Sequence, residues 1–134
     1  MSRRMAFLHL PPIRWLTSFY NPPIKNNEQK VVGWVGLEPF YGRAAYEHTC
    51  EIAIYIDKSV RHHGLGTQAI NFVISQLPQL GITAIVAYIF GHNLPSLGLF
   101  KSFHFTEWGR LPRVAELDGV QRDLIIMGRR FDLK

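Results

Sequence analysis

Apolar and polar residues alternate along two segments of the chain, Lys30–Phe40 and Thr49–Asp57, which are also rich in β-branched and aromatic residues. This period of two predicts two β-strands joined by the loop Tyr41–His48. In the second strand one face carries isoleucines, and Glu51 lies on the opposite face. A carboxylate in so apolar a strand is a candidate functional residue.

The pattern changes after Gly64, where apolar residues recur at the 3.6-residue spacing of an amphipathic helix. We expect Pro78 and Gly81 to end this helix. The next segment, Ile82–Phe90, is an almost continuous apolar run, which predicts a central strand covered on both faces.

A second, shorter helix is predicted to run to Ser102, with Asn93 as its N-cap. The remainder of the chain indicates two strands around a turn at Asp118-Gly119. Near the N-terminus, Ile13–Phe19 is expected to form a short helix. The order strand, helix, strand, helix, hairpin predicts an α/β (α+β) fold with a mixed sheet.

Composition narrows the class of protein. With 134 residues the chain fits one domain, spanning 1–134. No apolar run is long enough to predict a membrane span, and the basic start lacks the cleavage site of a signal peptide. The single cysteine, Cys50, gives no internal disulfide, so a cytoplasmic location is expected. The net charge of +5 favours an anionic partner, which includes nucleic acid, an acidic membrane and a phosphorylated small molecule.

The segment "RHHGLG" stands where the second strand gives way to the helix. Backbone N–H groups in such a turn point outward together, and the helix adds its positive dipole end, so Arg61–Thr67 predicts a pyrophosphate cradle. Gly64 and Gly66 would let the backbone approach a bulky anion. The competing interpretation is a helix-initiating turn whose glycines relieve crowding. A Walker loop and a dinucleotide-binding loop are both excluded by the residues that follow Gly66.

The stretch "VRHHGLG" resembles the R/Q-x-x-G-x-G/A signature of the GNAT superfamily of acetyl-CoA-dependent N-acetyltransferases. Three further blocks, "FYGRAAYEHTCEIAIYID", "FGHNLPSLGLFKSFHF" and "WGRLPRVAELDGVQRDLIIMGRRF", are similar in order and spacing to the branch of phosphinothricin and methionine sulfone/sulfoximine acetyltransferases. The resemblance covers Val31–Leu133. It implies the GNAT fold, a central mixed sheet flanked by helices, with acetyl-CoA as the acetyl donor and no metal.

The resemblance also assigns roles to individual residues. Ile54, Tyr55 and Ile56 would run beside the pantetheine arm and form hydrogen bonds to it through their backbone. The pyrophosphate turn would comprise Arg61, His62, His63, Gly64, Leu65 and Gly66, with Thr67 nearby. The later cofactor-contacting N-x-x-S corresponds to Asn93 and Ser96. The acceptor pocket would draw on Phe40, Tyr41, Arg43 and Tyr46, and Glu51 falls where relatives place an acidic residue near the acceptor amine.

The expected reaction is transfer of an acetyl group to the primary amine of a small amino-acid-like acceptor, similar to phosphinothricin or methionine sulfoximine. Because the amine must be neutral to attack a thioester, a base is needed, and Glu51 is the candidate. A structural carboxylate paired with Arg or Lys is the competing interpretation. A backbone N–H of the Ile54 strand would polarise the carbonyl.

The leaving thiolate has no obvious proton donor. Many relatives carry a Tyr or His where this chain has Phe100, which puts a dedicated general acid in doubt. Tyr88 and Tyr55 are possible substitutes, although we expect Tyr88 to pack in the core. His62 and His63 are interpreted as solvated turn residues rather than metal ligands, since no third ligand is suitably spaced. Cys50 is interpreted as a buried strand thiol.

Residues 1–30 depart from the family pattern, because a first strand and helix are expected to be largely missing. Apolar surface would then be exposed, and a homodimer is one expected consequence. An alternative function is a truncated acetyl-CoA-binding protein with little or no turnover. A basic nucleic-acid-associated module is a third and less favoured hypothesis, so we expect no nucleic-acid partner.

Overall fold

The structure is a computed structural model that describes residues 6–7, 23–26, 28–60 and 64–131. The strands are β1 (Ala6–Phe7), β2 (Pro23–Lys25), β3 (Val31–Pro39), β4 (Thr49–Ile56), β5 (Ala84–Phe90), β6 (Thr106–Leu117) and β7 (Val120–Arg130). The α-helices are α1 (Leu65–Leu80) and α2 (Leu94–Ser102), and short 3₁₀ turns cover Ala44–Tyr46 and Lys58–Val60. This order confirms the predicted α/β fold and the hairpin at its end.

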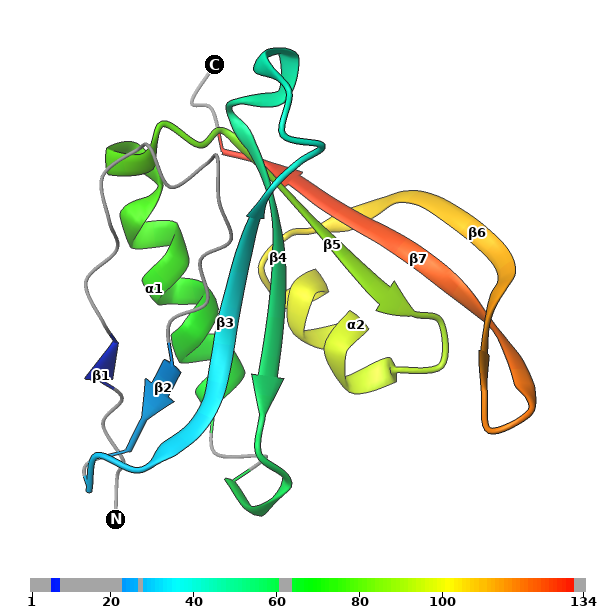
Figure 1. The fold of residues 1–134 in the computed structure, drawn as a ribbon, viewed down its shortest axis with the longest axis horizontal. Helices are drawn as coiled ribbons and strands as arrows, with labels where there is room; N and C mark the ends of the chain where they lie inside the picture. Colours follow the sequence, from blue (N-terminus) through cyan, green and yellow to red (C-terminus); the bar gives the residue numbers. More distant parts are fainter. Residues whose placement is uncertain (1–5, 8–22, 27, 61–63, 132–134) are drawn as a thin grey trace.

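The strands form one mixed sheet in the order β1-β2-β3-β4-β5-β7-β6 (Figure 1). The β4 and β5 pair is parallel, with α1 as its crossover, and every other neighbouring pair is antiparallel. The β6–β7 turn has Asp118 at φ 51° and Gly119 at φ 77°, the positive angles of a tight two-residue hairpin turn.

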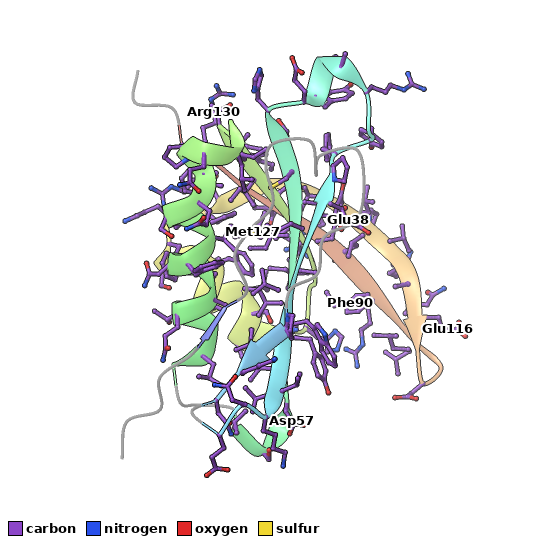
Figure 2. All side chains as sticks on the ribbon, turned by 60° about the vertical axis from the view of Figure 1, so that its left-hand side comes forward. Glu38, Asp57, Phe90, Glu116, Met127 and Arg130 are labelled. Atoms are coloured by element: carbon purple, nitrogen blue, oxygen red, sulfur yellow. The ribbon has the colours of Figure 1, made fainter. Side chains whose placement is uncertain are left out.

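The hydrophobic core lies between the two helices and one face of the sheet. Ile52 of β4, Val73 of α1 and Phe100 of α2 belong to one buried cluster. In Figure 2 Met127 lies between α1 and the sheet, whereas Glu38 and Phe90 lie on the side away from α1. The helix-covered face is therefore the apolar one, as the isoleucine-rich face of β4 predicted.

The end of α1 differs from the sequence prediction. Pro78 lies inside the helix, which ends at Leu80 and is closed by Gly81 alone, at φ 69°. The N–H of Gly81 donates to the carbonyls of Leu77 and Pro78. Pro78 has no N–H, so the helix gives up one hydrogen bond there, and the left-handed glycine sets the end point.

The N-terminal region is partly described. A two-residue β1 pairs antiparallel with β2 at the outer edge of the sheet. The predicted helix Ile13–Phe19 lies outside the described residues. Within the part of the chain that the structure describes, no helix has the length and apolar character needed to cross a membrane.

Candidate active site at the fork of the sheet

The strands β4 and β5 pair for a short distance and then separate. Their ladder has the rungs Thr49–Ala84, Cys50–Ile85 and Glu51–Val86, although β4 continues to Ile56 and β5 to Phe90. Beyond Glu51 that side of β4 therefore has no ladder partner on β5. Figure 1 shows the two strands diverging, with α2 drawn across the gap between them. The ladder between the two strands thus opens beyond Glu51.

The first turn of α1 supplies hydrogen-bond donors to this opening. Gly64, the N-cap, has φ 74°, and no side chain caps the helix. The first intrahelical bond runs from the N–H of Gln68 to the carbonyl of Gly64, so the N–H groups of Leu65, Gly66 and Thr67 have no helical acceptor. The first turn also contains no acidic residue. These features are typical of an anion-binding helix terminus.

A cleft of about 540 Å³ lies between this turn, the end of β4 and the start of α2. Its lining contains Ile54, Tyr55, Ile56, Gly64, Leu65, Gly66, Thr67, Asn93 and Ser96, together with Val60, Pro95, Leu99 and Phe100. The described residues that the resemblance assigned to acetyl-CoA are thus brought together in one cleft. Arg61, His62 and His63 lie outside the described residues, so their expected role stays a prediction.

The two glycines of the turn differ in their surroundings. A Cβ on Gly64 would meet no atom within 4 Å, so this glycine is needed for its left-handed backbone and leaves the approach open. A Cβ on Gly66 would lie 2.7 Å from a methyl group of Leu99. Gly66 therefore permits close approach of α1 and α2, which is the crowding-relief interpretation, while Gly64 fits the anion cradle.

Asn93 caps α2 as predicted, because its side-chain oxygen accepts a hydrogen bond of 3.3 Å from the N–H of Ser96. Pro95 follows in the first turn. The cap fixes the start of α2 against the cleft, and both Asn93 and Ser96 line it. Their position is compatible with the cofactor-contacting segment that the resemblance implied.

A second hollow lies on the other side of the same strand. Its volume is about 290 Å³, and its lining is Trp34, Gly36, Glu38, Glu51, Ala53, Ile54 and Tyr55. The Trp34 and Tyr55 rings are 5.8 Å apart between centroids and form part of its wall. Ile54 and Tyr55 line both spaces, so the cleft and the hollow adjoin across β4.

Glu51 lies in this hollow beside a second carboxylate. The β3–β4 register places Glu38 directly opposite Glu51. Burial, and after it the negative charge of Glu38, raises the pKa of Glu51 above its usual value. No Lys or Arg among the described residues forms an ion pair with Glu51. The arrangement is compatible with a base.

Replacing Glu38 tests this coupling. In Glu38→Gln the burial of Glu51 is unchanged but the neighbouring charge is gone, so the pKa of Glu51 should fall part of the way towards its usual value. If Glu51 is the base, the rising limb of kcat/KM against pH is expected to move to lower pH. Glu28→Gln is the control, because Glu28 is exposed and precedes the start of β3, at the end of the strand away from Glu38. This change should leave the rising limb of the pH profile in place. An unmoved limb in Glu38→Gln would contradict the coupling.

The predicted acceptor residues form an aromatic cluster next to the hollow rather than its wall. The ring centroid of Phe40 is 4.5 Å from that of Tyr41 and 5.4 Å from that of Tyr46, and the two tyrosine rings are 5.6 Å apart. Tyr41 is 71% exposed. Arg43 is exposed and stands in the same loop. None of the four lines the hollow that contains Glu51.

Two residues of the hollow, Trp34 and Glu38, were missed by the sequence analysis. Both alternate with buried β3 residues, and that alternation is the signal that could have placed them on the face of Glu51. Tyr88 was expected to pack in the core, but it is half-buried and lies outside the hydrophobic core cluster.

Cys50 is buried as expected, and burial, followed by the charge of Glu51, raises the pKa of its thiol to about 12. A thiol with so high a pKa stays protonated at neutral pH and is a poor nucleophile.

The comparison with protein families decides the classification. The model of the acetyltransferase (GNAT) family matches residues 6–105. The chain belongs to this family.

Among the described residues no group of three or more His, Cys, Asp or Glu side chains is placed to hold a metal ion.

Individual GNAT relatives agree with the family match. Over 101 residues the chain is 48% identical to YwnH of Bacillus subtilis, which is provisionally named a phosphinothricin acetyltransferase; the match covers 75% of this chain and 62% of YwnH. This chain is also 31% identical over 103 residues to the L-methionine sulfoximine/L-methionine sulfone acetyltransferase of Pseudomonas aeruginosa. That match covers 77% of this chain and 60% of the Pseudomonas protein. The chain therefore spans about three fifths of the length of these curated relatives.

Solved structures show the same fold. A crystal structure provisionally described as a phosphinothricin N-acetyltransferase has a TM-score of 0.80 and 42% identity, covering 84% of this chain and 71% of that one. The phosphinothricin acetyltransferase of Sinorhizobium meliloti, solved in complex with acetyl-CoA, has a TM-score of 0.78. It is 22% identical, and the match covers 84% of this chain and 61% of that one. At this identity the likeness concerns the fold.

Proposed function

We propose that this protein is an N-acetyltransferase that moves the acetyl group of acetyl-CoA to the primary amine of a small amino-acid-like acceptor, similar to phosphinothricin or methionine sulfoximine. One observation carries the proposal. The first-turn N–H groups of α1, which have no acceptor within the helix, belong to residues lining a cleft that adjoins, at Ile54 and Tyr55, the hollow containing Glu51. A donor and an acceptor entering from opposite sides of β4 would meet there.

The chain supplies the functions that the reaction needs. When bound, acetyl-CoA supplies the activated acetyl group. The N–H groups of Leu65, Gly66 and Thr67 would hold its pyrophosphate, and Arg61–His63 are expected to add to this grip. The backbone of β4 beyond Glu51 would align the pantetheine arm, and an N–H near Ile54 would stabilise the negative oxygen that forms in the transition state.

Glu51 is proposed to take the proton from the attacking amine, directly or through one water molecule. Its raised pKa brings it closer to neutrality than an ordinary carboxylate, which makes it a better base while it stays ionised. The acceptor is proposed to lie between the wall formed by Trp34 and Tyr55 and the exposed loop that carries Phe40, Tyr41, Arg43 and Tyr46. The names of the two curated relatives support an amino-acid-like acceptor.

The test pairs two measurements on the full chain. Calorimetric titration follows binding of acetyl-CoA, and thiol release follows turnover with phosphinothricin, methionine sulfoximine, methionine sulfone, common amino acids and polyamines. We expect binding together with thiol release from an amino-acid-like amine. Binding heat without thiol from any amine would instead favour the alternative of an acetyl-CoA-binding protein with little turnover. No binding heat would reject both.

We also propose a homodimer and a cytoplasmic location. The β6–β7 hairpin, at one edge of the sheet, exposes Trp108, Leu111 and Val114 at 48, 42 and 58%. Apolar side chains gathered on an edge hairpin are typical of a surface covered in an assembly. Sedimentation velocity distinguishes the dimer from a monomer. The cytoplasm is supported by the single unpaired, buried cysteine.

A further inference from the structure

The hollow that contains Glu51 follows one face of the β3–β4 ladder. Residues paired across the ladder point to the same face, and so do residues two apart along a strand. Apart from Ile54, the lining consists of three successive pairs: Trp34–Tyr55, Gly36–Ala53 and Glu38–Glu51. Two residues span about 7 Å of strand, so the ring pair and the carboxylate pair are roughly 13 Å apart along the strands. The hollow thus has an aromatic end, a floor of small residues and an acidic end.

The charge of this lining is negative. Two of the described residues that line the hollow are carboxylates, and none is Lys, Arg or His. Burial, and after it the charge of Glu38, raises the pKa of Glu51, so the two carboxylates interact within the hollow. Arg43, the cationic residue assigned to the acceptor pocket, is exposed in its loop and lies outside this lining. The hollow is therefore acidic in a chain whose net charge is +5.

This charge acts differently on the two parts of an amino-acid-like acceptor. Before the reacting amine loses its proton it is an ammonium ion, which the acidic end of the hollow attracts. A side chain that extends from that end passes over the floor of small residues towards the aromatic end. An uncharged side chain is accommodated there. An anionic side chain is repelled by both carboxylates, and the lining offers it no cation to pair with.

We propose that Glu38 is a specificity-determining residue that selects acceptors with an uncharged side chain, an inference that rests on the proposed acetyltransferase function. Of the acceptors named there, methionine sulfone and methionine sulfoximine have neutral side chains and are favoured. Phosphinothricin is disfavoured, because its phosphinate is ionised at neutral pH. Glu38 acts through the charge that it places in the hollow, while Glu51 keeps its proposed role as the base.

The test uses methionine sulfone and phosphinothricin as a matched pair of acceptors. At the same place in the side chain each has a tetrahedral atom that carries a methyl group and two oxygens, and both share the ammonium and carboxylate groups. They differ by one negative charge. With two carboxylates about 7 Å from that charge and ordinary salt screening, wild-type kcat/KM should be higher for methionine sulfone by about 10-fold or more.

Variants of Glu38 separate its charge from its shape. Glu38→Gln should reduce the preference for methionine sulfone by about threefold or more, whereas Glu38→Asp keeps the charge and should keep the preference. The ratio of the two kcat/KM values cancels any change in the basicity of Glu51, because both acceptors use the same base. Glu28→Gln is the control, since Glu28 is exposed and outside the hollow, and it should retain the wild-type ratio.

A wild type that uses phosphinothricin at least as well as methionine sulfone would overturn the proposal. Such a result would indicate that a cation such as Arg43 holds the phosphinate. A ratio that is the same in wild type and Glu38→Gln would also overturn it, because the preference would then not depend on the Glu38 charge.

Binding is measured separately from turnover. Each acceptor is titrated into isotopically labelled wild-type protein, and NMR follows the backbone amides of Gly36 and Ala53 on the floor of the hollow. The dissociation constant should be lower for methionine sulfone, and this preference should weaken as salt concentration rises. Equal affinities, or no shift of these amides with either acceptor, would overturn the inference. Absence of turnover with every amine would instead reject the proposed acetyltransferase function, which is a separate result.

Discussion

Glu51→Gln is expected to lower kcat by about 100- to 10,000-fold, the range for loss of a positioned general base. Glutamine keeps the shape of the side chain and its place between Glu38 and the fork of the sheet, but it cannot accept the amine proton. The affinity for acetyl-CoA should stay within about twofold, because the turn proposed to hold the pyrophosphate lines the cleft, whereas Glu51 lines the adjoining hollow. Steady-state thiol release and calorimetric titration measure the two quantities.

Stability gives an independent check on this variant. The folded-state pKa of Glu51 is raised, so the contribution of this carboxyl to stability is present in acid and is lost as pH rises through that pKa. At neutral pH the ionised group therefore destabilises the fold, and Glu51→Gln should be at least as stable as wild type in urea. An inactive variant that is also less stable at neutral pH would indicate that Glu51 has a structural role instead.

Gly33→Ala is expected to lower the free energy of unfolding by about 2 to 3 kcal/mol, at the upper end of the cost of overpacking. A Cβ at this position would lie 2.2 Å from the backbone carbonyl oxygen of Tyr55 on the neighbouring strand. Because that atom belongs to the main chain, β3 and β4 must separate to make room. Urea unfolding followed by circular dichroism measures the change.

The displacement should also reduce activity, since Tyr55 lies between the cleft and the hollow. Gly98→Ala is the matched control. A Cβ on Gly98, inside α2, would meet no atom within 4 Å, so alanine there should stabilise the helix by about 0.5 to 1 kcal/mol. Wild-type stability in Gly33→Ala would show that the two strands are not packed as closely as described.

The secondary structure was largely predictable because it depends on local features of the chain. The alternation in Thr49–Asp57, the helical spacing after Gly64 and the Asn93 cap each act over a few residues, and all three appear in the structure. Pro78 is the exception. Proline is a local signal for a helix end, but here the helix continues for two residues past Pro78 and Gly81 sets the boundary.

The site was predictable where a motif concentrates its residues in one segment. Gly64–Thr67 and Ile54–Ile56 follow one another along the chain, and they line one cleft. Glu38 and Tyr88 carry no such signal, since each is a polar residue in a strand whose partner is remote in sequence. Their place on the face of Glu51 follows from the register Glu38–Glu51 and from the rung Glu51–Val86.

The sequence by itself determined the order of elements from β3 onward, the glycine turn and the family, because periodicity, capping and short motifs are local properties. The tertiary structure alone decided where β4 and β5 separate, which carboxylate faces Glu51 and that the cleft at the start of α1 adjoins the hollow containing Glu51. The physical reason is that strand register and strand separation are set by hydrogen bonds and packing between segments far apart in the chain.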